Sequence, residues 1–178
     1  MKVILLQGEG GLVKISFQKK GKYLLCMSLI MLLQKRTVEL SRTIEVHSPG
    51  NIKPAYLGIV QLPNGYTVMA DWNNKTCCLY DSSYNLITDY TLLGNPSNMC
   101  LIGDSEVAVT LSPSTVQFLS IGDRSIRDIG VVRTKYACVG VDAVSKEEIL
   151  VSGYYCHTWN NNKCYWSLMT RNGNVQFH

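Results

Sequence analysis

The chain has 178 residues, of which 17 are lysine or arginine and 13 are aspartate or glutamate, so its formal net charge is +4. Residues 1–50 hold eight basic and three acidic residues, net +5, whereas residues 51–178 hold nine and ten, net −1. Because phosphate neutralisation supplies much of the affinity for nucleic acid, the near-neutral larger part disfavours nucleic-acid binding there.

Residues 1–50 form an atypical N-terminal segment that does not share the pattern of the rest. Within it, residues 23–33 are largely apolar, but they are too few to span a bilayer, which needs about 20. A basic flank before them is similar to a signal peptide, yet it starts too deep in the chain and no cleavage site follows. We expect a short buried helix or strand here, or a start-site artefact, and a stray strand at residues 43–46.

Three later stretches are versions of one another. Residues 62–70, 102–110 and 144–152 each contain an apolar residue, a polar turn and an alternating apolar strand, at offsets of 40 and 42 residues. A period of about 40–45 residues built only of short strands is typical of β-propeller blades. The repeats therefore predict an all-β fold in which each unit is one four-stranded antiparallel sheet.

No run from Asn51 onward has a sustained 3.6-residue apolar period, so helices are not expected there. The pattern predicts four strands in each of the three units. Their ranges are 57–61, 66–71, 76–81 and 86–90, then 97–102, 106–111, 115–120 and 125–129, and finally 138–143, 148–153, 164–170 and 174–177.

The first unit resembles the NHL repeat in residues 58–65 (GIVQLPNG), 68–71 (VMAD) and 79–81 (LYD). The second unit is a weaker copy, with Leu111 in place of Asp71, and the third has an enlarged loop from Tyr154 to Tyr165. The resemblance covers about 125 residues. The resemblance is strongest to the NHL-like propellers at the C-terminus of tripartite-motif-like proteins, which are numerous in molluscs and other invertebrates.

This resemblance implies that residues 51–178 are a partial NHL-like β-propeller. Propellers of that family have around six blades, and a propeller protects its sheet edges by closing into a ring, which three blades cannot do. We therefore expect an incomplete propeller of about three blades, as a fragment of a longer protein. The alternative is an intact open array of three sheets.

Asp71 and Gly65 are predicted to be structural turn residues. In NHL-like blades an aspartate at this position caps the turn by accepting backbone N–H bonds, and glycine accepts a positive φ at little cost. The alternative for Asp71 is a calcium ligand, as in gluconolactonase-like six-bladed hydrolases. That site needs carboxylates in several blades, whereas Leu111 and Gly153 stand at the matching positions.

No other residues form a pattern for chemistry. The seven cysteines, at positions 26, 77, 78, 100, 138, 156 and 164, include no CxxC pair, and their odd number without a secretion signal favours a reducing cytoplasm. Zinc needs four converging ligands, but Cys156, His157 and Cys164 supply only three. We predict no catalytic, cofactor or metal site.

The resemblance implies a protein-interaction propeller, similar to the substrate-recruiting end of tripartite-motif-like ubiquitin ligases, whose RING and B-box modules are absent from this sequence. Aromatic residues in the enlarged loop are the predicted partner-binding residues: Tyr154, Tyr155, His157, Trp159 and Tyr165. The alternatives are a calcium-dependent lactonase-like hydrolase and an RNA-binding NHL propeller. Uncovered blade edges also predict self-association.

Overall fold

The computed structural model describes residues 2–8, 11–19, 22–24, 39–46, 49–154, 164–173 and 175–177. It divides into two compact units, Met1–Ser48 and Pro49–His178. Every regular element in the described part is a β-strand, and all of these strands belong to four-stranded sheets. Among the described residues, no helix is long and apolar enough to cross a membrane.

The first unit is one antiparallel sheet with the strand order β3-β2-β1-β4. Its strands are β1 (Lys2–Gly8), β2 (Gly11–Lys19), β3 (Lys22–Leu24) and β4 (Glu39–Glu45). Residues 43–45, expected as part of a stray strand, belong to β4, which pairs with β1. Most of the apolar stretch, from residue 25 to residue 33, lies outside the described residues.

The second unit contains three sheets, and in each of them the strands are neighbours in chain order. The first sheet consists of β5 (Tyr56–Gln61), β6 (Thr67–Asp71), β7 (Thr76–Tyr80) and β8 (Leu86–Thr91). The second consists of β9 (Pro96–Ile102), β10 (Glu106–Leu111), β11 (Thr115–Ile121) and β12 (Ile126–Arg133). The third consists of β13 (Ala137–Ala143), β14 (Glu148–Tyr154), β15 (Cys164–Thr170) and β16 (Val175–Phe177).

All twelve strands predicted from the repeats are confirmed, and their ends lie within one residue of the expected positions with one exception. β12 continues to Arg133 instead of ending at residue 129. The pairing of β11 with β12 shifts register opposite Gly130, whose φ is 149°, and the strand resumes beyond this bulge. Glycine accepts that backbone angle without steric cost, so the strand survives the interruption.

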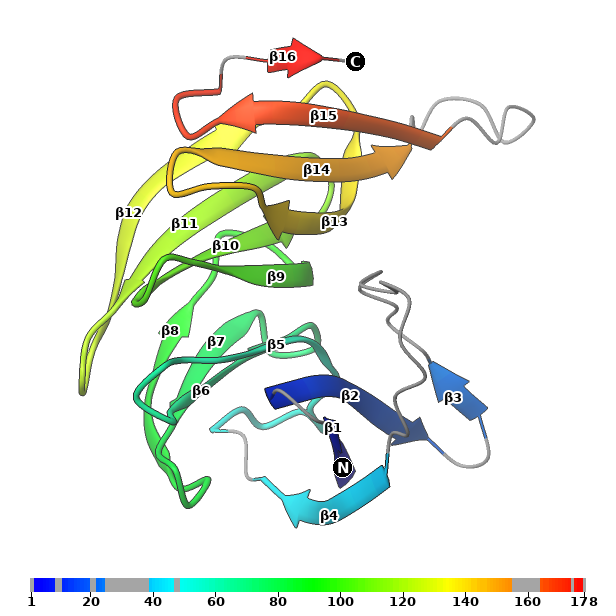
Figure 1. Ribbon diagram of the computed structural model, residues 1–178, viewed down its shortest axis with the longest axis vertical. Coiled ribbons are helices and arrows are strands. Elements are labelled where there is room, and N and C mark those ends of the chain that lie inside the picture. Colours follow the sequence, from blue (N-terminus) through cyan, green and yellow to red (C-terminus); the bar gives the residue numbers. More distant parts are fainter. Residues whose placement is uncertain are drawn as a thin grey trace. The chain divides into compact units, whose positions relative to one another are not determined.

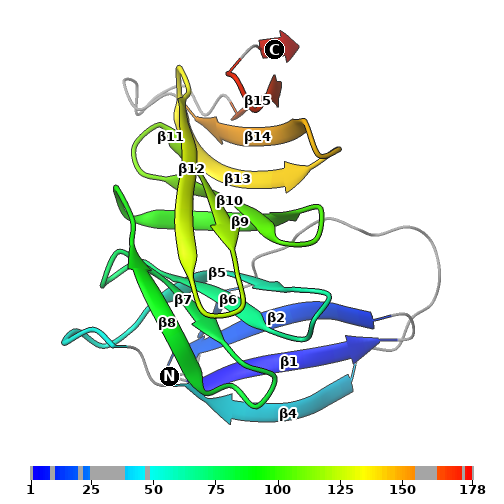
Figure 2. The ribbon, with the colours of Figure 1, turned by 90° about the vertical axis from the view of Figure 1, so that its left-hand side faces the viewer.

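The three sheets follow one another with their first strands side by side (Figures 1 and 2). β5 lies against β9 and β9 against β13. The approach is close, since a Cβ atom on Gly58 would lie 2.8 Å from Cγ of Met99. The described sheets of this unit do not close into a ring (Figure 1).

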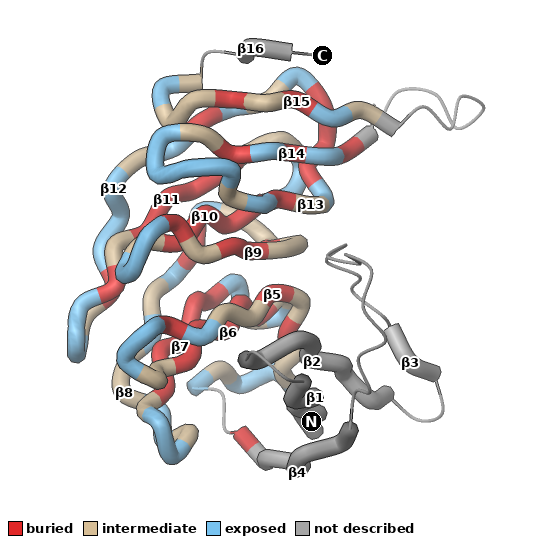
Figure 3. The backbone as a smooth tube through the Cα atoms, viewed as in Figure 1, coloured by how far each residue is buried: buried red, intermediate tan, exposed pale blue. Residues whose placement is uncertain are grey.

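Two apolar layers hold the three sheets together, and Figure 3 colours the buried residues of these sheets red. One layer joins the first and second sheets and includes Val68, Ala70, Cys77, Leu79, Val107, Val109, Leu111 and Leu119. The other joins the second and third sheets and includes Ala108, Val116, Phe118, Val141, Ile149, Val151 and Met169. β10 supplies alternate residues to both layers because successive side chains on a strand point to opposite faces. The middle sheet is therefore buried on both faces.

Candidate functional site

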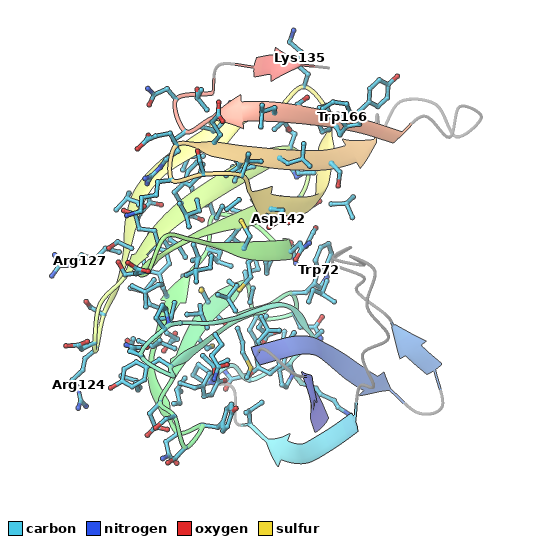
Figure 4. The ribbon with its side chains drawn as sticks, in the orientation of Figure 1. Trp72, Arg124, Arg127, Lys135, Asp142 and Trp166 are labelled. Atoms are coloured by element: carbon cyan, nitrogen blue, oxygen red, sulfur yellow. The ribbon has the colours of Figure 1, made fainter. Side chains whose placement is uncertain are left out.

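Half of the turns in the second unit gather at one end of its sheets. Neighbouring strands run antiparallel, so the turns after β6 and β10 lie at the same end as the connections that lead into β5, β9 and β13. We call this end the Trp72 rim, comprising residues 49–55, 72–75, 92–95, 112–114 and 134–136. Figure 4 shows Trp72 at this end and Arg124 at the other.

Asp71 anchors the first turn of the Trp72 rim. Its side chain is fully buried. Oδ1 accepts the backbone N–H of Ala55 at 2.9 Å and that of Asn73 at 3.0 Å, and Oδ2 accepts the side-chain amide of Asn74 at 2.7 Å. Asn74 in turn donates to the carbonyl oxygen of Ile52 at 2.8 Å. The carboxylate thus joins its own turn to the segment that leads into β5.

Further hydrogen bonds tie each turn of the rim to a neighbouring connection. The side-chain amide of Asn95 donates to the Trp72 carbonyl at 2.9 Å, and Asn95 accepts the Ser112 N–H at 2.9 Å. The N–H of Thr134 donates to the Ser114 carbonyl at 2.9 Å. The rim is therefore a continuous hydrogen-bonded structure across three sheets, which limits the freedom of its turns.

The third sheet brings an aromatic pair to the same end. The rings of Tyr136 and Tyr165 stack with centroids 6.1 Å apart and planes 25° apart. The Tyr136 hydroxyl donates to the Val151 carbonyl at 3.1 Å. Tyr165 is half-buried and packs against the layer between the second and third sheets. Gly153 lies beneath this pair, where a Cβ atom would collide with the Ala137 carbonyl oxygen.

Of the predicted partner-binding residues, only Tyr165 has a described side chain. Tyr154 is the last residue of β14, where its backbone alone is described, and Tyr155, His157 and Trp159 lie outside the described residues. Tyr154 pairs with Cys164 at the start of β15. Tyr154 and Cys164, which flank the enlarged loop, therefore lie at the end of the third sheet that corresponds to the Trp72 rim.

Gly65 lies at the opposite end of the sheets. Its φ of 86° is in the left-handed region, and its N–H donates to the Leu62 carbonyl at 2.9 Å. The turn closes with a bond of 2.8 Å from the Leu62 N–H to the Tyr66 carbonyl. Nearby, Asp81 accepts bonds from Asn85 and Ser83, and the side-chain bond from Asn85 is the main cause of its lowered pKa.

Charges of opposite sign gather at the two ends of the sheets. In the described part of the second unit, the Trp72 rim and the strand end beside it carry the exposed cations Lys53, Lys75, Arg133 and Lys135, with the buried Asp71 as the acidic residue. The opposite end carries six carboxylates, at Asp81, Asp104, Glu106, Asp123, Glu147 and Glu148, beside Arg124, Lys146 and Arg171. The net charge of −1 over residues 51–178 hides this separation.

The sequence analysis missed this separation of charge because it used only the net charge of residues 51–178. The separation could have been predicted from the expected strands, because successive turns in an antiparallel sheet of strands in chain order lie at opposite ends of the sheet. Exposed apolar side chains add to the basic end: Ile52 and Leu93 are largely exposed, and Trp72 is half-buried. The Trp72 rim therefore combines apolar and cationic side chains on a hydrogen-bonded base.

The described thiols are unsuited to nucleophilic chemistry. Cys77, Cys78, Cys100 and Cys138 are buried and unpaired with each other. Burial raises the pKa of Cys78 to about 11 and that of Cys100 to about 12, so both remain protonated near neutral pH. Within the described residues, no group of three or more His, Cys, Asp or Glu side chains is placed to hold a metal ion.

No protein-family model and no curated protein matches the sequence. Solved structures do match: the WD40 domain of Neurospora crassa Pan2 has a TM-score of 0.57 at 12% identity over 78% of this chain and 42% of that one. The β-propeller domain of Myceliophteria thermophila Cps50 (Swd1) has a TM-score of 0.55 at 9% identity, over 79% and 50% of the two chains. A protein of unknown function from Bacteroides caccae has a TM-score of 0.55 at 10% identity, over 67% and 47%.

These similarities identify the fold as a β-propeller, and the three sheets of residues 56–177 are its blades. The chain spans about half the length of the structures it matches, in agreement with three blades that do not close. At such low identity the similarity carries no information on activity or on the NHL type of propeller.

Proposed function

We propose that this chain is a protein-interaction module that binds its partner at the Trp72 rim and catalyses no reaction. The observation that carries this proposal is the combination of exposed Ile52 and Leu93 with three lysines on a hydrogen-bonded rim and Arg133 beside it. Loops held by a rigid repeat scaffold commonly carry recognition. A buried apolar contact surrounded by charged residues is the usual composition of a protein interface.

The charge of the rim indicates the chemistry of the partner. Positive potential attracts and orients an acidic surface, and it also rejects a basic one. We infer an acidic polypeptide segment that carries apolar side chains to contact Ile52 and Leu93. The flanks of the loop from Tyr154 to Tyr165 support adding that loop, with Tyr155, His157 and Trp159, to the same binding surface.

The resemblance of residues 58–81 to the NHL repeat supports a more specific role, as the substrate-recruiting part of a tripartite-motif-like ubiquitin ligase. Buried free thiols favour a reducing compartment, and we place this role in the cytoplasm. A lactonase-like calcium site receives no support, because the Asp71 carboxylate serves as the acceptor of its own turn.

RNA is the second candidate, favoured by one observation: the rim and the strand ends beside it carry four exposed cations, and the acidic residue there, Asp71, is buried. Nucleic-acid binding proteins rely on such clusters to neutralise phosphates. The exposed leucine and isoleucine among the cations favour a polypeptide over RNA.

Charge reversal at the two ends of the sheets tests the proposal. We expect K75E/K135E to lose at least about tenfold of the recovered partner in quantitative affinity purification, because both changes repel an acidic segment. The matched control is R124E/K146E at the opposite end, which should recover the partner as the native chain does. Circular dichroism checks that both variants fold.

Equal recovery by both variants would contradict the proposal. Recovery that disappears after ribonuclease treatment would instead assign the rim to RNA.

A further inference from the structure

The backbone of Lys75 is strained, although the residue lies in an exposed turn of the Trp72 rim. Its φ is 53°, in the left-handed region that favours glycine. Among the described non-glycine residues only Tyr84 also has a positive φ, and it lies in a turn at the opposite end of the sheets. Within the described rim, Lys75 is therefore the one non-glycine residue with this conformation.

Hydrogen bonds on both sides hold the turn of residues 72–75 in place. On one side the Asp71 carboxylate accepts the side-chain amide of Asn74 at 2.7 Å. On the other side the Lys75 carbonyl accepts the N–H of Leu92 at 2.8 Å. A residue in a strained conformation persists only where its surroundings fix it in this way.

The equivalent turn of the second blade avoids the strained conformation. It has three residues, 112–114, between its paired strand ends, whereas residues 72–75 make a turn of four. None of residues 112–114 has a positive φ. Glycine or asparagine at position 75 would adopt the left-handed backbone at lower cost, so the stability of the turn does not explain a lysine there. Strained residues of this kind cluster at sites that hold a ligand.

Two exposed apolar side chains flank this turn. The side-chain amide of Asn74 donates to the Ile52 carbonyl at 2.8 Å, and its Oδ1 accepts the Ile52 N–H at 3.3 Å. Leu93 follows the residue that is bonded to Lys75, and the buried Gln117 accepts the Leu93 N–H at 3.2 Å. Ile52 is 59% exposed and Leu93 69%. Because Ile52 precedes β5 and Leu93 follows β8, the turn between β6 and β7 lies between them.

We infer that Lys75 binds an acidic side chain of the partner, and that apolar side chains on either side of this acidic residue contact Ile52 and Leu93. The inference rests on the proposed function and specifies the motif that the Trp72 rim recognises. The Lys75 side chain is exposed and makes no ion pair with another described residue, so its three N–H donors are available to a carboxylate. Since the turn is already fixed, binding requires little further ordering of its backbone.

Selection of short random peptides, displayed on phage, against the full chain tests this inference. We expect the selected peptides to share an aspartate or glutamate between apolar residues. One such peptide is then synthesised with a fluorescent label, and its dissociation constant for each variant is measured by fluorescence anisotropy. K75N should bind it at least about tenfold more weakly than the native chain does. K75R keeps the charge and should bind it like the native chain.

Urea denaturation distinguishes recognition by Lys75 from a structural role. Because asparagine tolerates the left-handed region, K75N should keep or raise the midpoint of unfolding while its affinity for the peptide falls. A lysine that served only to hold the turn would give a lower midpoint in K75N, which contradicts the inference. The matched control is K146N, which removes an exposed lysine at the opposite end of the sheets and should change neither the affinity nor the midpoint.

A further variant of the rim, K135E, separates this inference from the proposed function. If K75N binds the peptide like the native chain while K135E binds it weakly, the inference fails and the proposed function stands. If both variants bind it like the native chain, the peptide binds outside the rim and both are contradicted. Selected peptides without an acidic residue, or a selection that enriches no peptide, also overturn the inference.

Discussion

At Asp71 one buried carboxylate joins residues that are far apart in the chain. It accepts N–H groups from Ala55 and Asn73 and the side-chain amide of Asn74, and each of these donors would be left without this acceptor if the carboxylate were removed. Hydrogen bonds to charged groups are among the strongest in proteins, and losing a buried acceptor strands its donors. The residue thus joins the first turn of the rim to the segment that leads into β5.

We therefore predict that D71A lowers the free energy of unfolding by about 3 kcal/mol, measured by urea denaturation. D104A is the control, because Asp104 is exposed and its replacement should change the value by less than about 0.5 kcal/mol. A calcium-binding role for Asp71 would appear differently, as a rise in the native chain's melting temperature on adding calcium that is absent in D71A.

The ends of the strands are predicted well from the sequence wherever a turn residue marks them. Pro63, Asn64 and Gly65 correctly separated β5 from β6. β12 was underestimated, because the apolar pattern breaks at Gly130 while the backbone passes through a bulge and resumes pairing. A sequence pattern records side chains, and it cannot show that the hydrogen bonds of the ladder continue past such a break.

The turn between β5 and β6 depends on the backbone conformation of one glycine. Gly65 has a φ of 86°, which glycine adopts freely and other residues adopt at a cost. Because a Cβ atom there would meet nothing closer than Ser82 at 3.8 Å, the cost is one of backbone conformation. We expect G65A to lose about 1 kcal/mol of stability in urea denaturation and G65N to lose less, since asparagine tolerates this region. Equal losses of stability in G65A and G65N would indicate that steric crowding, and not backbone conformation, sets the cost.

For the molecule as a whole, the period of 40 to 42 residues was enough to predict three blades, because each repeat is one sheet. Two other properties depend on how strands are placed together, and the sequence reasoning did not find them. The separation of charge between the two ends follows from which turns share an end. The sheet of residues 2–45 joins β1 to β4 across a long stretch of chain, and no repeat marks those residues in the sequence.

Hydrogen–deuterium exchange of the full chain, with and without its purified partner, measures whether the partner binds at the Trp72 rim. We predict slower exchange on binding at residues 52–55, 72–75, 92–95 and 112–114, which belong to the rim. Residues 103–105 and 122–125 at the acidic end should keep their exchange rates. Protection confined to the acidic end, or no protection in the rim at saturating partner, would contradict the account.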